Sequence, residues 1–241
     1  MLLVKEAIAR VKALYNKGKD SDDSRLSDRH IYAKLVSARS LLVKREIDKN
    51  RTPSDWIMQT IPCLKLIDAA PNECPCIPPA GCAMKRSVSR LPKPIQSRIG
   101  PELEAVTTMD GSIIFSRTTW IKKKYKAGDK YTNFKPDYFI KDGYLFITSN
   151  LTDDDLLVYI SVSGAFEDPL EILYVDTCEK NCFDPLEAVF PIDGHLLDAI
   201  IQLATQELVS VFKATPEDQF NDARDPNISV SSSPSPKTAP E

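Results

Sequence analysis

Four cysteines within a span of twenty residues could bind a metal ion. Cys63 precedes the closely spaced pair Cys74 and Cys76, and Cys82 follows them. Four thiolates bind Zn²⁺ as a tetrahedron, but structural zinc sites usually separate paired cysteines by two to four residues, and here one proline separates them. Three states are therefore open: a zinc site, disulfides formed in oxidising surroundings, or free thiols. The spacing favours reduced, partly buried thiols, so we expect no metal and no cofactor.

A lysine-rich run with interleaved aromatic residues could contact phosphates. Lysines neutralise a nucleic-acid backbone, and aromatic rings stack on exposed bases. The same pattern also fits a solvated hairpin tip with aromatic side chains packed at its base. The lysines that would make the contact, with DNA or with an acidic protein surface, are Lys122, Lys123, Lys124, Lys126 and Lys130.

No motif typical of an enzyme is present in the sequence. His30 and His195 lie in the first turns of expected helices, without a nearby nucleophile motif. Asp153–Asp155 lacks the spacing of a calcium loop and fits a solvated turn between strands. With eight glycines in the chain and no glycine-rich loop, a phosphate cradle is disfavoured. We expect a protein without catalytic residues.

The composition is that of an ordinary globular protein. The chain has 241 residues, of which 42% are hydrophobic and 27% charged, and its net charge is −3. A negative net charge argues against a surface devoted as a whole to nucleic acid, so any DNA contact must be local. The start of the chain is charged and periodic, and no stretch reaches the length of a membrane span. We expect no signal peptide and no membrane contact.

Helices are expected at both ends of the chain. Apolar residues from Val4 to Tyr15 recur every three or four positions, and a second stripe runs from Ile31 to Ile47 after a cap at Ser27 or Asp28. Asp193 caps a third helix whose apolar stripe covers about half the circumference, which indicates burial on two sides. We expect part of that stripe to contact another subunit or partner, and the residues concerned are Leu197, Ile201, Leu208 and Phe212.

Between these helices the apolar period changes to two. Asp110-Gly111 and Asp142-Gly143 each lie between short alternating runs, as in tight hairpins, and a further strand runs from Leu156 to Val162. The expected fold class is α+β: a helical unit interrupted by an antiparallel β-meander or small barrel, with a disordered C-terminal tail. The expected segments are the N-terminal helices (1–60), an irregular connection rich in cysteine and proline (61–100), the β insert (101–185), C-terminal helices that pack on residues 1–60 (186–225), and a flexible tail (226–241).

This order of elements resembles a known family. The order of elements resembles that of the head-to-tail connector proteins of tailed bacteriophages. Two sequence segments add to the resemblance: Val162 to Pro169 at the end of a strand, and Asp218 to Arg224 after the last long helix. The greatest similarity is to the ring or adaptor proteins of crAss-like podoviruses. The cysteine-rich segment is not part of the general connector pattern.

The resemblance implies a non-enzymatic virion protein at the head–tail junction, made in the host cytoplasm. Copies of the chain, twelve in the usual case, would form a ring that binds the portal and further tail or ring proteins and continues the channel for packaged DNA. The lysine run would then face the DNA or the next ring. A ring needs two different complementary faces, which the C-terminal helix and the β insert could supply.

Two other functions are open on the residues alone. The β insert could hold a peptide or a nucleic acid, which would make the chain a non-enzymatic binding or regulatory module. A metal-dependent hydrolase would use the cysteines and Asp153–Asp155 as ligands. A mass near twelve protomers would favour the ring, and stoichiometric metal would favour the hydrolase.

Overall fold

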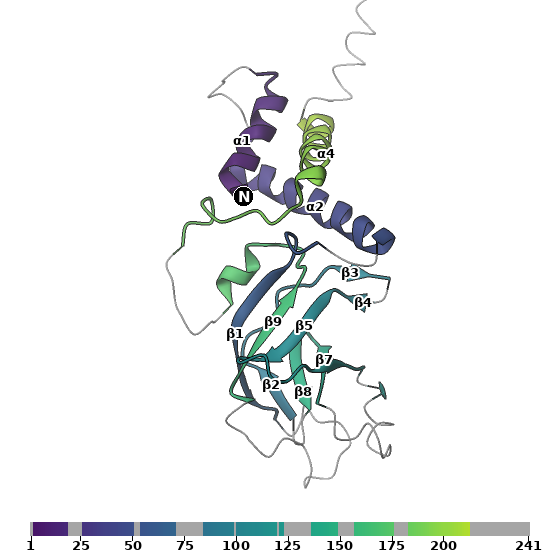
Figure 1. Cartoon of the computed structure of the whole chain (residues 1–241). Helices are drawn as coiled ribbons and strands as arrows, with labels where there is room; N and C mark the ends of the chain where they lie inside the picture. Colours follow the sequence, from purple (N-terminus) through teal and green to yellow (C-terminus); the bar gives the residue numbers. More distant parts are fainter. Residues whose placement is uncertain are drawn as a thin grey trace, which may run out of the picture.

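The molecule is elongated, with helices at one end and a β-sheet at the other (Figure 1). The computed structural model describes residues 2–18, 26–50, 54–70, 84–98, 100–119, 121–122, 136–148, 157–175 and 183–212. The end of the expected C-terminal helical segment, residues 213–225, and the expected tail, residues 226–241, lie outside these residues. We call the two parts the helical unit and the β unit.

Three helices form the helical unit: α1 (Val4–Tyr15), α2 (Asp28–Asn50) and α4 (Gly194–Phe212). The two N-terminal helices were expected, and their ends have local causes. Gly18, with φ of 76°, donates from its N–H to the Ala13 carbonyl and closes α1, whereas Ser27 Oγ accepts from the His30 N–H at the start of α2. Helix α4 packs on both α1 and α2. It therefore buries a wide apolar stripe inside its own subunit.

The β unit is a largely antiparallel sheet of seven strands. The order across the sheet is β5-β9-β1-β2-β8-β7-β6, and only β6 and β7 pair in parallel. Residues 113–117 also contact β5, because Phe115 N–H donates to the Val106 carbonyl at 2.8 Å, so the sheet nearly closes on itself. The strands are β1 (Gln59–Asp68), β2 (Met84–Ser87), β5 (Leu103–Thr108), β6 (Ser116–Arg117), β7 (Asp137–Lys141), β8 (Tyr144–Thr148) and β9 (Tyr159–Gly164). A separate small hairpin joins β3 (Gln96–Ser97) to β4 (Gly100–Pro101).

Both predicted hairpins are confirmed. Strands β7 and β8 turn at Asp142 and Gly143, whose φ angles are 54° and 81°, as a tight turn of this type requires. The other turn contains Gly111, with φ of 71°, and brings Thr107 opposite Ile114. The α+β class is therefore confirmed.

One sequence expectation differs from the structure. The segment 61–100 is not an irregular connection, because it contains β1 and β2 in the middle of the sheet. The register between β1 and β9 shifts between Ile61 and Leu64, so the apolar residues of β1 do not alternate regularly around Pro62 and Cys63. A proline fits a strand at such an irregularity. The expected β insert is confirmed in its small-barrel form, since the sheet nearly closes, and its strands are not in sequence order, because β9 lies between β5 and β1.

The chain enters and leaves the β unit through neighbouring strands. Strand β1 follows α2, and β9 leads back toward α4, and these two strands pair with Gln59 opposite Gly164. After β9 comes a 3-10 helix, η2 (Glu171–Tyr174). The segment from Phe183 to Asp193 then runs along the start of the chain, where Val189 pairs with Leu3. The β unit is therefore an insertion between α2 and α4.

Separate apolar cores stabilise the two units. The helical core contains Ile31, Leu35, Ile200 and Ala204, each fully buried, and it extends onto Ile95 and Ala165 at the near end of the β unit. The β core lies inside the curved sheet and includes Leu64, Leu145, Ile160 and Phe166. On the opposite face of β7 and β8, Phe139 and Phe146 stack with ring centroids 5.1 Å apart.

Candidate interaction surfaces

Of the four clustered cysteines, the structure describes one. Cys63 lies on β1, is 3% exposed and is disulfide-bonded. The expectation of reduced thiols is therefore wrong for this residue, because an oxidised sulfur is neither a free thiol nor a thiolate ligand. Cys74, Cys76 and Cys82 lie outside the described residues. Within the described ranges, no group of three or more His, Cys, Asp or Glu side chains could hold a metal ion.

The lysine run is described at one position only. Lys122 is exposed and follows Ile121, which is 68% exposed. The other predicted contact residues lie outside the described residues: Lys123, Lys124, Lys126 and Lys130. The exposure of Lys122 is compatible with either predicted role, contact with DNA or contact with another ring.

The predicted contact residues of α4 divide into two groups. Ile201 and Leu208 are buried against α1 and α2 in the subunit's own core, and Leu197 is half-buried against the same core. Phe212, at the C-terminal end, is 41% exposed, and its ring centroid is 6.2 Å from that of His30. Of the four residues, Phe212 is the one that offers most surface to a partner.

A fully buried arginine joins the helical unit to the segments around it. Arg39 on α2 donates from Nε to the Pro191 carbonyl at 2.8 Å and from Nη1 to the Phe166 carbonyl at 2.7 Å. Burial lowers the pKa of Arg39 to about 10. Sequence reasoning missed this role; the available signal was an arginine four residues after Leu35 on the buried side of an amphipathic helix.

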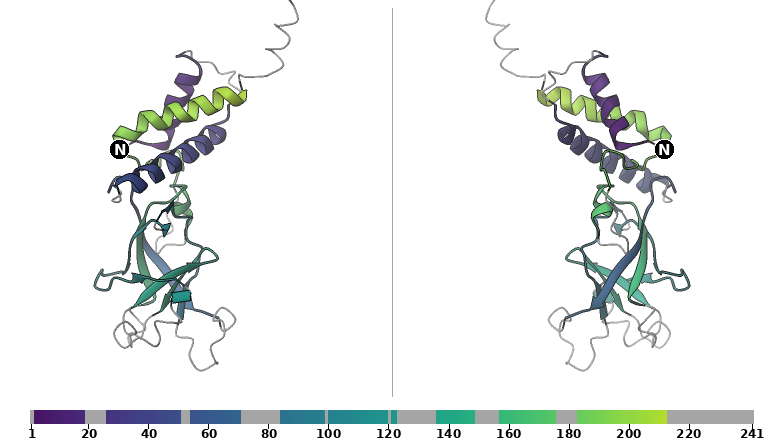
Figure 2. Two further views of the ribbon diagram at one scale, coloured as in Figure 1. Left: turned by 90° about the vertical axis from the view of Figure 1, so that its right-hand side faces the viewer. Right: turned by 90° about the vertical axis from the view of Figure 1, so that its left-hand side faces the viewer.

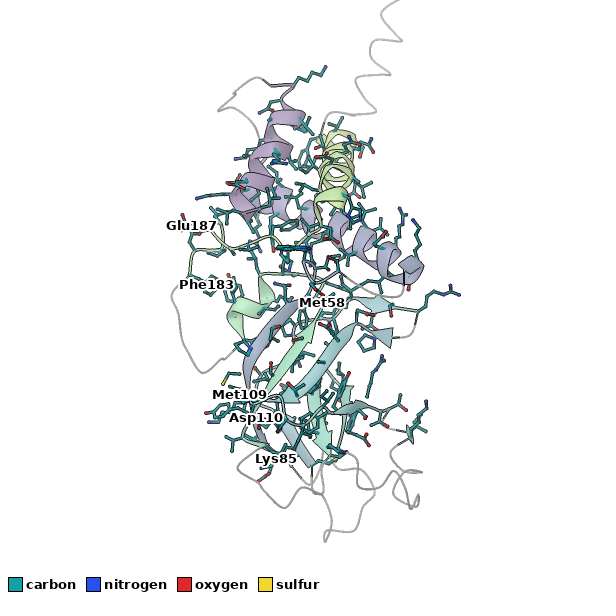
Figure 3. All side chains as sticks on the ribbon, viewed as in Figure 1. Met58, Lys85, Met109, Asp110, Phe183 and Glu187 are labelled. Atoms are coloured by element: carbon teal, nitrogen blue, oxygen red, sulfur yellow. The ribbon has the colours of Figure 1, made fainter. Side chains whose placement is uncertain are left out.

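Further polar contacts fix the same junction. Ser54 Oγ donates to Asp193 Oδ1 at 2.8 Å, which ties the chain after α2 to the start of α4. The Arg98 N–H donates to Asp48 Oδ1 at 2.8 Å, which ties the β3–β4 hairpin to the end of α2. Figure 3 shows Met58 at this junction, between the helices and the sheet. The bond from Arg98, with the bond from Arg39 to the Phe166 carbonyl, connects the β unit to the helical unit.

A mixed-charge cavity of about 410 Å³ lies between the end of α2 and the β3–β4 hairpin. Asp48 and Glu102 line it together with Arg98 and Arg117. The Arg117 guanidinium donates to the Pro101 carbonyl at 3.4 Å and passes so close to Gly100 that a side chain there would clash. Because two acidic and two basic residues line it, the cavity does not favour a ligand of either charge.

An apolar groove of about 290 Å³ lies at the N-terminal end of α4. We call it the Trp56 groove. Its apolar walls come from three parts of the chain: Leu2, Trp56, Met58, Val189, Phe190 and Ile192. Trp56 is 64% exposed and Val189 is 44% exposed, and Asp55 lies at the same groove. Sequence reasoning missed this groove, because its walls are far apart in the chain and show no common period.

Charge is unevenly divided within the helical unit. Segment 183–212 contains five acidic residues and no lysine or arginine, whereas α2 contains six lysines and arginines against three acids. An ion pair connects the two sides, from Lys34 Nζ to Glu207 Oε2 at 3.0 Å. The α2 side of the unit is thus basic, and the segment around α4 is acidic.

Comparison with known proteins identifies the family. Of the helices in the described part of the chain, none is long and apolar enough to cross a bilayer. No curated protein is a detectable relative. The family model described as "Phage tail ring protein 2" matches residues 6–227, which is nearly the whole chain and includes both units. The chain therefore belongs to the phage tail ring protein 2 family of crAss-like phages.

Proposed function

We propose that this tail ring protein is a connector at the junction of head and tail, where it joins the portal to the tail and continues the DNA channel. Membership of the family over residues 6–227 is the observation that carries the proposal. A family named for a tail ring implies a structural part of the virion built from several copies. We propose twelve copies, with the portal on one side and further tail or ring proteins on the other.

The arrangement of the chain supports a ring. A ring of identical subunits needs two different surfaces that fit each other, so that repeated rotation closes. The helical unit carries an apolar groove beside the N-terminal end of α4 and exposed apolar residues at its C-terminal end. In the proposed ring the helical units form the wall or meet the portal, and the β units project toward the neighbouring ring.

The proposed contact with DNA is local. Lys122 is exposed, and the adjacent lysines Lys123, Lys124, Lys126 and Lys130 continue the same basic run in sequence. In the proposed ring this run either faces the channel or contacts the next ring. The net charge of −3 argues against a surface that binds DNA as a whole, which suits a channel through which DNA must move. We propose that this role involves no catalysis, metal or cofactor.

Electron microscopy of the intact phage particle tests the proposed position. Density for this chain is expected as a closed ring between portal and tail, and its rotational symmetry gives the copy number. In parallel, a phage carrying a premature stop in this gene should accumulate DNA-filled heads without tails. A ring located elsewhere in the virion, or tailed particles in the absence of this chain, would overturn the connector proposal.

A charge-reversal series tests the DNA contact. Lys122, Lys123 and Lys124 are replaced together by Glu, and Lys44 and Lys49 on α2 serve as the control set, since the structure places both of these on the exposed side of the helix. If the run faces DNA, the first set should slow DNA ejection while particles still assemble. If it contacts the next ring, assembly itself should fail. Equal behaviour of both sets would show that the run has neither role.

A further inference from the structure

The two ends of helix α4 carry different apolar surfaces. The N-terminal end lies beside the chain's N-terminus and the Trp56 groove, and the C-terminal end lies at the opposite side of the helical unit (Figure 2). With 19 residues at 1.5 Å each, α4 separates these ends by roughly 28 Å. We call Val211, Phe212 and the neighbouring His30, together with Arg29, which precedes His30 in the chain, the Phe212 knob.

We propose that the Trp56 groove of one subunit receives the Phe212 knob of a second copy of the chain. The proposal rests on the ring function proposed above and names the contact that would build the ring. Because groove and knob are different surfaces at opposite sides of the subunit, each copy can use both at once. Such a head-to-tail contact repeats from copy to copy and closes into a ring if the rotation allows.

The groove has the size and chemistry of a site for a few side chains. Its volume of about 290 Å³ is at the lower limit for small-molecule sites, which favours side chains over a cofactor. Trp56 leaves 64% of its surface exposed there, and tryptophan is among the residues that contribute most to protein–protein binding. At the same groove, Gln59 Oε1 is buried and has no hydrogen-bond partner among the described residues, so it can accept a bond from an incoming chain.

The knob has matching apolar surface. Val211 is 60% exposed and Phe212 is 41% exposed, and they are the last two residues of α4. A single exposed apolar residue is ordinary on a protein surface. Here two adjacent ones end a helix beside the His30 ring, at 6.2 Å between ring centroids. Aromatic side chains next to an arginine are a composition that protein interfaces favour.

Charge complements the apolar match. Asp55 lies at the groove, and Arg29 lies one residue before His30 at the knob, and both are exposed. Neither side chain forms an ion pair with the described residues of its own chain. A knob entering the groove would therefore place Arg29 on the side of Asp55.

A capped-dimer experiment tests this contact. Trp56→Ser disables the groove and leaves the knob intact, whereas Phe212→Ser disables the knob and leaves the groove intact. In sedimentation velocity of the full chain, wild type should assemble beyond a dimer, and each variant alone should need at least tenfold higher concentration to associate. An equimolar mixture of the two variants should stop at a dimer, because the one intact knob fills the one intact groove.

Ile114→Ser is the matched control, because Ile114 is a large apolar residue that is 68% exposed on the β unit, away from both surfaces. It should assemble like wild type, and thermal melting should be unchanged in all three variants. A mixture that assembles to the wild-type size would overturn the proposal. So would variants that assemble normally, or wild type that stays monomeric at every concentration.

A charge exchange provides independent evidence. Asp55→Arg and Arg29→Asp should each weaken assembly, and the double variant should recover it, because attraction between opposite charges is restored in exchanged form. If the double variant does not recover assembly, Asp55 and Arg29 do not contact each other between subunits. If microscopy shows a ring of this chain but these variants assemble like wild type, the proposed contact is wrong and the ring function stands. If microscopy shows no such ring, both the contact and the ring function are wrong.

Discussion

Tyr32 and Asp168 lie 136 residues apart in the chain, yet the Tyr32 hydroxyl donates a 2.6 Å hydrogen bond to Asp168 Oδ1. Tyr32 is on α2 and Asp168 follows β9, so the bond connects the helical unit to the exit of the β unit. Burial, and after it the hydrogen bond to the carboxylate, raises the pKa of Tyr32 above its ordinary value. The hydroxyl therefore stays protonated and able to donate across the physiological pH range.

Removing this hydroxyl should loosen the junction. Tyr32→Phe is expected to lower the free energy of unfolding by about 2 kcal/mol, because a hydrogen bond to a charged acceptor is lost. Urea denaturation measures the change. Tyr174→Phe is the control, since Tyr174 is 68% exposed, and it should leave stability unchanged. Equal effects of the two substitutions would show that the bond contributes nothing.

Arg39 should contribute more than any exposed arginine. Arg39→Met fills similar space but leaves the carbonyls of Phe166 and Pro191 without their donor, so a loss of about 3 kcal/mol is expected. Arg45→Met, on the exposed side of the same helix, should change stability by less than about 0.5 kcal/mol. A stable Arg39→Met protein would mean that the desolvation cost of the buried charge outweighs its bonds.

The packed face of α4 should not tolerate charge. Ile200 is fully buried, and Ile200→Asp should cost more than about 4 kcal/mol or prevent folding. Circular dichroism and thermal melting measure this. Gln202→Asp, two residues away on the exposed side, should melt close to wild type. A folded Ile200→Asp protein would contradict the assigned buried face.

Gly164 should be required by close packing at the end of β9. A Cβ at this position would lie 2.7 Å from the Glu102 carbonyl oxygen and 2.7 Å from Leu103 Cδ2. Gly164→Ala should therefore lower the melting temperature, at a cost of about 2 kcal/mol. At Gly194, where nothing lies within 4 Å of such a Cβ, the same substitution should be neutral or stabilising.

Asp110 should titrate well below an ordinary aspartate. Hydrogen bonds from the Thr108 hydroxyl, from the Ser112 hydroxyl and from the Ser112 N–H lower the pKa of Asp110 to about 2. Because the folded pKa lies below the ordinary 3.8, the carboxylate stabilises the fold above that pH and loses this effect as pH falls toward 2. Figure 3 shows Asp110 beside Met109 at the turn after β5.

Carboxyl NMR titration of Thr108→Val tests this assignment. The pKa of Asp110 should rise toward 3.8, because the 2.6 Å bond from Thr108 Oγ1 is the largest cause of the shift. Thr107→Val, the neighbouring position on the same strand, should leave it unchanged. An unaltered pKa in Thr108→Val would assign the shift to Ser112 instead.

Local sequence patterns predicted where the helices and hairpins lie better than they predicted which strands pair with each other. The helical stripes and the two Asp-Gly hairpins depend on residues close in sequence, and the structure has them where the periods indicated. Strand β1 was missed because Pro62 and Cys63 interrupt its alternation at a register shift. The insertion of β9 between β5 and β1 depends on contacts between distant segments, which no local period records.

The candidate interaction surfaces likewise depend on contacts that local sequence patterns do not record. The breadth of the α4 stripe predicts apolar surface left for a partner, but Ile201 and Leu208 are buried within the subunit because α4 packs on two helices. A sequence period shows that a face is apolar, and it does not show whether the same chain covers it. Trp56 was overlooked for a related reason, since its groove forms only when Leu2 and Val189 come together.

The pairing of β1 with β9 at the entrance of the β unit has a consequence for how such proteins change over time. Since Gln59 and Gly164 are neighbours, a sheet of another size or shape could be joined at the same two points, provided that it again supplies the apolar contacts that Ile95 and Ala165 make with the helical core. A tail could thus exchange what it presents to the next component without rebuilding the frame that holds the assembly together.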